Sequence, residues 1–411
     1  MKKAFYLLVI FAAFTGFLAI AEEVFPAPVD SGTHFMKDAL TPFVEDGRLP
    51  GAISVLYKDG TQETLCIGYA DVENKRPITM DDIFMQASQT KAFCGVTIAM
   101  LVEEGKITLD DPVSKYLPEF NVLWVMDSEK DGVRTLHQAK NILTIRMCMN
   151  HTGGFPFEVC AKRSNIKGGG WTGGAPLRSV AAIAAACPLR TEPGTKVAYS
   201  NVGFDIAAAI VEIVTGRPWD QFLKERVLDP LEMTSTTFYP TDEMLKNKIE
   251  LYKVFKDQAA EHRTYYHWQQ PPYNDSHVFV SAAAGLWTTA NDQMKFYKML
   301  MNKGVGNNGV RILKEETFMK LMTVNSRPKE LPNDWYSLGL NADKYGWIGH
   351  GGALLTSGYV NWRTRELKLW VVQVVTGPKF WEEAKTEAER KFFGTDIDRA
   401  GQSKYTGRTK E

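Results

Sequence analysis

The stretch "QASQTKAFCG" (Gln86–Gly95) places Ser88 three residues before Lys91, at the point where an apolar run begins. On a helix, positions i and i+3 share a face, so these two side chains would lie one turn apart. A serine hydroxyl becomes a nucleophile when a base removes its proton, and an amine desolvated among apolar neighbours has a depressed pKa and can help. The pattern therefore predicts a catalytic pair at the start of a buried helix.

The Ser-x-x-Lys spacing alone is weak evidence, because two other pairs share it: Ser164 with Lys167, and Ser326 with Lys329. Those pairs lie in polar segments. Only the run after Ser88 is apolar nearly all round, and it stops at Gly105, a typical C-terminal helix signal. The helix behind it is what favours Ser88.

A second motif, "YSN", places Tyr199 and Asn201 just before the apolar segment "VGFDIAAAIVEIVTG". A tyrosine beside a lysine ammonium can act as general base, and an asparagine amide can orient a substrate carbonyl. The alternative is a packed tyrosine beside an N-cap asparagine. Tyr359 and Asn361 repeat the spacing inside a strand pattern, so the spacing leaves both interpretations open.

A third motif, "WIGHGGALLTSG", ends a strand pattern with His350, Gly351 and Gly352, and Ala353 follows. Two glycines leave room for a substrate along the strand, and a backbone N–H there could donate to an oxyanion together with that of Ser88. The alternative is a glycine-rich strand end with a solvent-facing histidine. The sequence His151-Thr-Gly153 has the same form.

The order of the three motifs, with "TLDDPVSKYLPEF", "TIRMCMNHTGGFP" and "AAAGLWTTANDQMKFYKML" between them, resembles the serine β-lactamase and penicillin-binding-protein-like hydrolases. The resemblance runs from about Val29 to Val375 and is to the class C β-lactamase-related branch. It implies an α+β fold: an antiparallel sheet built from both chain ends, flanked by helices, with a mainly helical region inserted. Strand patterns near residues 50–70 and 335–377 agree with this expectation.

The resemblance also implies roles for individual residues. Ser88 would be the nucleophile, Lys91 and Tyr199 would move its proton, and Asn201 would hold the substrate. The amides of Ser88 and Ala353 would form the oxyanion hole. Water or another acceptor would then release the acyl-enzyme.

The third motif differs from that of the class C β-lactamases, which resembles Lys-Thr-Gly. His350 replaces the cationic lysine and Gly351 replaces the threonine hydroxyl, so we expect weaker recognition of a substrate carboxylate. In "GGFPFEV", Glu158 falls near the implied acyl pocket, where it would repel acidic substrates or suit an amine.

The sequence therefore predicts a serine hydrolase of ester or amide bonds. The alternatives are a D,D-peptidase or β-lactamase acting on cell-wall peptide or β-lactams. From another class, a penicillin-binding sensor with little turnover stays open. The expected partner is a small ester, amide or short peptide.

Lys2, Lys3 and an apolar run to Ile20 predict a signal peptide over residues 1–21 and export to the periplasm or outside the cell. The hydrolase domain would cover residues 22–377, and residues 378–411 would form a charged tail. The glycine-rich insert at residues 168–174 is expected to be a surface loop or a lid.

Composition and residue spacing argue against several other kinds of binding site. A formal net charge of zero argues against a nucleic-acid-binding surface. The chain has no His-x-x-x-His or Cys-x-x-Cys spacing, so we expect no metal and no cofactor. Of the five cysteines, Cys160 and Cys187 flank the glycine-rich insert and are the expected pair if an oxidising compartment forms a disulfide.

Overall fold

The computed structural model describes residues 29–30, 32, 34–157, 176–254, 260–263, 279–329, 336–375 and 379–394. The expected signal peptide, Glu158, Cys160, the glycine-rich insert and residues 395–411 of the expected tail lie outside these ranges. The expectations for them stay predictions.

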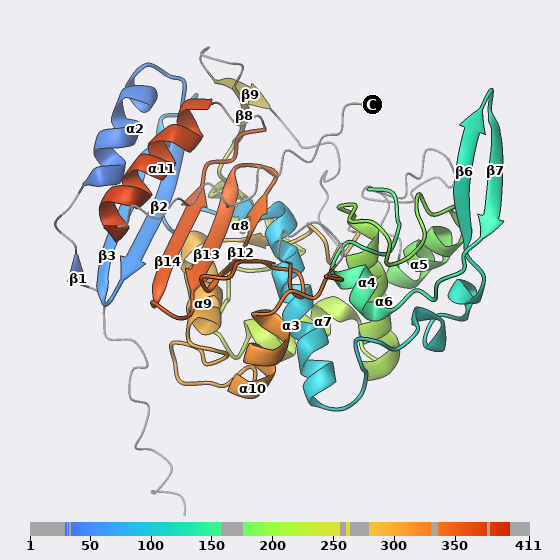
Figure 1. The fold of residues 1–411 in the computed structure, drawn as a ribbon. Helices are drawn as coiled ribbons and strands as arrows, with labels where there is room; N and C mark the ends of the chain where they lie inside the picture. The colour runs from blue at the N-terminus through green and yellow to red at the C-terminus, as the bar shows by residue number, and fades with distance from the viewer. Residues whose placement is uncertain are drawn as a thin grey trace, which may run out of the picture.

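One sheet dominates the described part of the chain, with strand order β1-β3-β2-β14-β13-β12-β11 and β4 paired to β3. Its strands are β1 (Val29–Asp30), β2 (Gly51–Lys58), β3 (Thr61–Asp71), β4 (Arg76–Pro77), β11 (Asn341–Ala342), β12 (Trp347–Gly352), β13 (Thr356–Asn361) and β14 (Glu366–Val371). Pairing is antiparallel except between β1 and β3. The expected α+β fold, with a sheet assembled from both chain ends, is confirmed (Figure 1).

The two halves of the sheet meet where β2 pairs with β14, in a register that runs from Lys58 opposite Glu366 to Ile53 opposite Val371. The β2–β3 hairpin turns at Asp59 and Gly60, which have φ values of 48° and 84°. Both central residues therefore adopt the left-handed conformation of a type I′ turn, which the sequence Asp-Gly favours.

Helices cover both faces of the sheet. Because side chains alternate along a strand, Leu56 and Trp370 face one side while Val55 and Leu369 face the other. On the first face lie α2 (Phe35–Glu45) and α11 (Lys379–Phe393), which pack against each other (Figure 1). On the second face, α9 (Ala290–Met301) contacts β13 and β14.

The inserted region is built around α3 (Thr90–Glu103), whose residues from Thr90 to Leu101 are all buried. The helix ends as the sequence predicts: Gly105 has a φ of 66°, its N–H donates to Val102 O, and Lys106 N–H donates to Leu101 O. These two bonds form a Schellman motif, which requires the left-handed residue that glycine supplies.

Shorter elements complete the described chain. The helices are α4 (Ile145–Met149), α5 (Leu177–Ala186), α6 (Val202–Thr215), α7 (Trp219–Leu223), α8 (Asp242–Lys246) and α10 (Glu315–Thr317), with one-turn segments η1 (Ala87–Gln89), η2 (Val113–Lys115), η3 (Pro118–Asn121), η5 (Lys224–Leu228) and η6 (Phe318–Met322). The strands are β5 (Phe84–Met85) with β10 (Trp287–Thr288), β6 (Trp124–Lys130) with β7 (Val133–Gln138), and β8 (Leu251–Lys253) with β9 (Glu261–Arg263).

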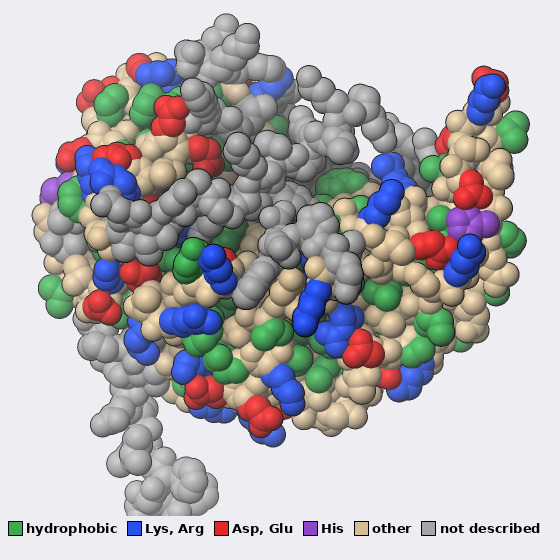
Figure 2. All heavy atoms as spheres, in the orientation of Figure 1, with side chains coloured by type: hydrophobic (Ala, Val, Ile, Leu, Met, Phe, Trp, Pro, Cys, Tyr) green, Lys and Arg blue, Asp and Glu red, His purple; other side chains and the backbone are tan. Residues whose placement is uncertain are grey.

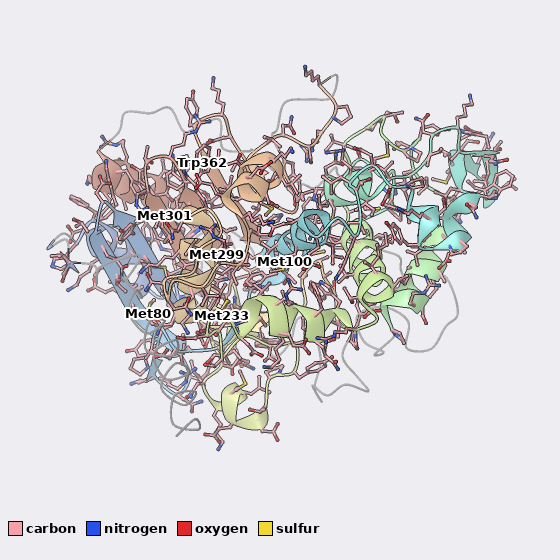
Figure 3. All side chains as sticks on the ribbon, turned by 90° about the horizontal axis from the view of Figure 1, so that it is seen from below. Met80, Met100, Met233, Met299, Met301 and Trp362 are labelled. Carbon is pink, nitrogen blue, oxygen red and sulfur yellow. The ribbon has the colours of Figure 1, made fainter. Side chains whose placement is uncertain are left out.

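Buried methionines belong to the main core cluster, which spans α3, α9 and the second face of the sheet. Figure 3 labels four that are nearly inaccessible: Met100, Met233, Met299 and Met301. Unbranched, polarizable side chains suit the irregular gaps between a sheet and helices that cross it at different angles.

The structure differs from the sequence expectations at two places. The strand pattern expected from residue 335 begins later in the structure: Tyr336 makes an isolated bridge, and β11 begins at Asn341. Gly339, with a φ of 72°, turns the chain against α3 at a place where a Cβ would meet the backbone of Lys91. The β6–β7 hairpin, which projects from the molecule in Figure 1, was not expected.

Within the described ranges, no helix combines the length and apolarity needed to cross a membrane. On the described part of the face shown in Figure 2, Lys and Arg side chains are interspersed with Asp and Glu.

Candidate active site

Ser88 lies in η1, the single turn that leads into α3. Its neighbours from Asp82 to Ala87 and from Gln89 to Met100 are buried, whereas Ser88 itself is partly exposed. Ala87 has a φ of 50°, a left-handed conformation that is strained for a residue with a Cβ. Such strain persists where the surrounding structure enforces it, often at functional sites, and here it accompanies the presentation of Ser88.

Lys91 is completely buried, and its ammonium nitrogen has three oxygen partners. Nζ lies 2.8 Å from Asn201 Oδ1, 2.9 Å from Ala283 O and 3.3 Å from Ser88 Oγ. The amide and carbonyl oxygens can only accept, so they hold two protons on Nζ. The third position faces Ser88, where Nζ can donate as an ammonium or accept as an amine. The geometry thus suits proton exchange between Ser88 and Lys91.

Tyr199 and Asn201 come from the chain that enters α6. Asn201 occupies the N-cap position but makes no side-chain cap bond. Ser200 Oγ instead accepts the N–H of Val202, which leaves the Asn201 amide to Lys91. Lys91 Nζ lies 4.7 Å from the centroid of the Tyr199 ring. The interpretation of Asn201 as a simple capping residue is wrong, and the motif lies beside the Ser88–Lys91 pair.

The competing motifs have other surroundings. Burial raises the pKa of Tyr359 in β13 to about 12, and its hydroxyl accepts from Asn341. Ser326 Oγ donates to Tyr336 O, and Lys329 is exposed in a segment without helix. Ser164 and Lys167 lie outside the described ranges.

His350 reaches the site from β12 and is 4% exposed, so the interpretation of a solvent-facing histidine is wrong. Nδ1 lies 2.6 Å from Gly351 O, which can only accept, and Nε2 lies 3.1 Å from the hydroxyl of Tyr336. Nδ1 therefore carries the proton and Nε2 accepts from Tyr336. Burial, together with the nearby Lys91 charge, lowers the pKa of His350 to about 3, so the ring is neutral near pH 7.

The two glycines after His350 differ in what surrounds them. A Cβ on Gly351 would find nothing closer than Thr356 O at 3.9 Å. A Cβ on Gly352 would lie 2.5 Å from Gln86 O and would also clash with Thr356 Oγ1. Gly352 thus lets β12 lie against the backbone just before Ser88. The turn that begins at Ala353 is brought beside the turn that carries the nucleophile.

His151 repeats the His-x-Gly form of the third motif, and its side chain forms part of the site. Its ring centroid lies 4.3 Å from that of Tyr199 and 4.7 Å from that of Tyr336. Nδ1 accepts the N–H of Ser200 at 3.2 Å. Burial, with the Lys91 charge, holds the pKa of His151 well below its usual value. A neutral imidazole thus packs behind Tyr199 and supports the loop of the second motif.

Ala283 is a second residue that the sequence did not reveal, because it acts through a backbone carbonyl.

No cluster of three or more His, Cys, Asp or Glu side chains suited to a metal ion occurs among the residues that the structure describes.

Comparisons with known proteins agree with this geometry. Residues 36–394 match a protein-family model described as Beta-lactamase. An uncharacterized protein of Mycobacterium tuberculosis is 30% identical over 280 residues, which cover 67% of this chain and 68% of the relative. A putative D-alanyl-D-alanine carboxypeptidase of Escherichia coli K12 is 29% identical over 293 residues, covering 68% of this chain and 61% of the relative.

Among solved structures, EstCE1, a hydrolase with promiscuous acyltransferase activity, superposes with a TM-score of 0.67. The match covers 86% of this chain and 97% of that chain. Because the identity is 21%, the match supports a shared fold and nothing further. The resemblance inferred from the three motifs is confirmed.

Proposed function

Because the chain belongs to the β-lactamase family and is a serine hydrolase, we propose that it cleaves an ester or amide bond through an acyl-enzyme formed on Ser88. The observation that carries the proposal is the contact of Ser88 Oγ with the buried Nζ of Lys91. A lysine held at that distance by two further acceptors is a base in place to activate the serine.

In the first step, Ser88 Oγ forms a bond to the substrate carbonyl carbon, and its proton passes to the Lys91–Tyr199 pair. The amides of Ser88 and Ala353 stabilise the oxyanion. The bond to the leaving alcohol or amine then breaks, and the leaving group takes the proton. In the second step, water attacks the acyl carbon, loses a proton to the same pair, and Ser88 regains its hydroxyl as the acid leaves.

The third motif supports a substrate without a carboxylate beside the scissile bond. His350 is neutral and already bonded to Tyr336 and Gly351, and Gly351 offers no hydroxyl. A carboxylate at this wall would find neither a cation nor an alcohol from the motif itself. We therefore place uncharged esters and amides ahead of β-lactams.

A D,D-peptidase is the second candidate, because an Escherichia coli relative is a putative D-alanyl-D-alanine carboxypeptidase. A cation also lies behind the same wall: the guanidinium carbon of Arg327 is 5.1 Å from the centroid of the Tyr336 ring. Its Nε donates to Asn150 O.

The N-terminal sequence supports an exported enzyme, because two lysines precede an apolar run of signal-peptide length. Transfer of the acyl group to an alcohol instead of water would use the same intermediate. Product analysis in the presence of a competing alcohol separates the two outcomes.

The test combines one substitution with a substrate panel. Ser88→Ala should abolish turnover of p-nitrophenyl butyrate, while Ser114→Ala, a partly exposed serine in η2, should leave it unchanged. Turnover by Ser88→Ala would refute the nucleophile assignment. The panel adds a chromogenic cephalosporin and a D-alanyl-D-alanine peptide, and the preferred substrate identifies the class. A long-lived penicillin adduct on Ser88, with no substrate turned over, would point to a sensor.

A further inference from the structure

Asp205 is a carboxylate inside an apolar helix. It is the one charged residue in the stretch Val202–Val211 of α6, and it is 4% exposed. It lies one helical turn after Asn201, whose amide oxygen contacts Lys91. A charge in such a place is costly unless it is hydrogen-bonded, so its partners matter.

The partners of Asp205 are in the turn Ser281–Ala283. Asp205 Oδ1 accepts from Ser281 Oγ at 3.0 Å and from the N–H of Ala282 at 2.9 Å. Ser281 Oγ in turn accepts the N–H of Ala283 at 3.2 Å. One buried carboxylate thus fixes three consecutive residues of a turn that has no strand or helix of its own.

That turn supplies one of the acceptors of Lys91, because Ala283 O lies 2.9 Å from Nζ. Its other side is tied to the residues around Ser88: Leu286 N–H donates to Thr90 Oγ1 at 3.3 Å, and Gln86 N–H donates to Leu286 O at 3.1 Å. The carbonyl that holds the lysine is therefore clamped between α6 and the nucleophile turn.

We propose that Asp205 is a positioning residue, which holds the Ala283 carbonyl in place and thereby keeps the Lys91 amine against Ser88. The inference rests on the proposed function of the Ser88–Lys91 pair. Helix α6 would then position Lys91 twice: directly through Asn201, and indirectly through Asp205 and the turn. Without the Ala283 carbonyl, Nζ would lose one of the two acceptors that orient its third position toward Ser88.

The charge of Asp205 adds a second readout. Burial raises the pKa of Asp205 to about 7, against the hydrogen bond from Ser281 and the charge of Lys91, which lower it. The titratable groups facing it are Lys91 and the thiol of Cys94, both on α3. Above about pH 7, where Asp205 carries its charge, the carboxylate disfavours loss of a proton from the Lys91–Tyr199 pair, so removing that charge should move the part of the acid limb of kcat/KM that lies above pH 7 to lower pH.

The experiment compares Asp205→Asn, Asp205→Ala and Ser281→Ala with the control Asp292→Asn. Asp292 is also a buried carboxylate that holds a loop, through Ser235 N–H at 2.8 Å and Thr236 Oγ1 at 3.0 Å, and it is not bonded to Lys91 or its acceptors. Each variant is checked by circular dichroism, then assayed for kcat and KM on p-nitrophenyl butyrate from pH 5 to 9. The rate at which a fluorophosphonate labels Ser88 is measured in parallel.

We expect Asp205→Ala to lower kcat and the labelling rate by about 10²-fold, the scale of a misplacement near 1 Å, with KM within about twofold of wild type. Asp205→Asn keeps one acceptor oxygen and should lose less, while shifting the acid limb to lower pH. If Asp205→Ala does not fold, Ser281→Ala and Asp205→Asn carry the test.

Wild-type kcat and labelling in folded Asp205→Asn and Ser281→Ala would overturn the inference, as would an effect confined to KM or shared equally by Asp292→Asn. Ser88→Ala in the same series separates the two proposals. Turnover by that variant would overturn the proposed function, whereas its inactivity beside fully active Asp205 and Ser281 variants would overturn only the role of Asp205.

Discussion

Adding a single methyl group at Gly352 should damage catalysis without unfolding the protein. A Cβ at this position would lie 2.5 Å from Gln86 O, about 0.9 Å short of an ordinary contact of 3.4 Å. The clash with Thr356 Oγ1 can be relieved by rotating that side chain. The clash with Gln86 O cannot, because it involves the backbone of the turn that carries Ser88.

Relief therefore has to come from moving the end of β12 away from Ser88 by most of an ångström. The amides of Ser88 and Ala353 would then no longer fit one oxyanion. Misplacement on this scale costs up to about 10²-fold in rate, or roughly 3 kcal/mol of transition-state stabilisation. The loss should appear in kcat and in fluorophosphonate labelling of Ser88, since both reactions develop charge in the oxyanion hole.

Gly351→Ala is the matched control, one residue away on the same strand. Its Cβ would meet nothing closer than 3.9 Å, so we expect a folded protein that loses less than about tenfold. Both variants are assayed with p-nitrophenyl butyrate, with thermal unfolding to confirm the fold. If folded Gly352→Ala has the same kcat and labelling rate as Gly351→Ala, then the contact between β12 and the turn that carries Ser88 does not control catalysis, and the prediction is wrong.

Two further predictions concern buried ionisable groups. Because burial and the Lys91 charge lower the pKa of His350 to about 3, its contribution to stability is present above about pH 6.5 and lost as pH falls, by up to about 1.4 kcal/mol per pH unit. His350→Gln should flatten the fall in the urea-unfolding free energy between pH 7.5 and 5; an unchanged slope would contradict this. Glu389 accepts from Lys368 at 2.7 Å and from Trp370 Nε1 at 3.1 Å. Glu389→Gln should therefore lower the unfolding free energy by about 3–5 kcal/mol, because it leaves the Lys368 charge buried without its partner. The double variant Lys368→Met/Glu389→Leu should lose much less. An unchanged unfolding free energy in Glu389→Gln would contradict this reasoning.

Much of the architecture could be predicted from local signals that agree with one another. The Asp59-Gly60 turn, the apolar helix ending at Gly105 and the strand patterns at both chain ends each carry a distinct periodicity or turn chemistry. The order of the three motifs then selected one arrangement of these elements.

The rest of the site depends on contacts that leave no mark in a short motif. Ala283 contributes a carbonyl oxygen, which every residue has, so its role depends on where the chain turns. His151 shares its motif form with His350 and differs only in what packs around it. Asp205 did leave a signal, a lone carboxylate in an apolar helix, but the sequence does not tell which turn that carboxylate holds. The strand pattern expected from residue 335 begins only at Asn341, because Gly339 bends the chain onto α3.

The pairing of β2 with β14 also constrains how the protein is made. Lys58 and Glu366 are partners although 308 residues (366 − 58) separate them, and Ser88, Lys91 and Tyr199 all lie within that interval. During synthesis, one edge of the β2–β3 hairpin stays unpaired until nearly the whole chain has left the ribosome. Closing so long a loop costs entropy before the contacts form, so we expect this pairing to form late in folding. A nascent chain that ends before β12 carries the nucleophile and its lysine but lacks the strand against which the nucleophile turn packs. We therefore expect the hydrolytic site to form late, together with closure of the sheet.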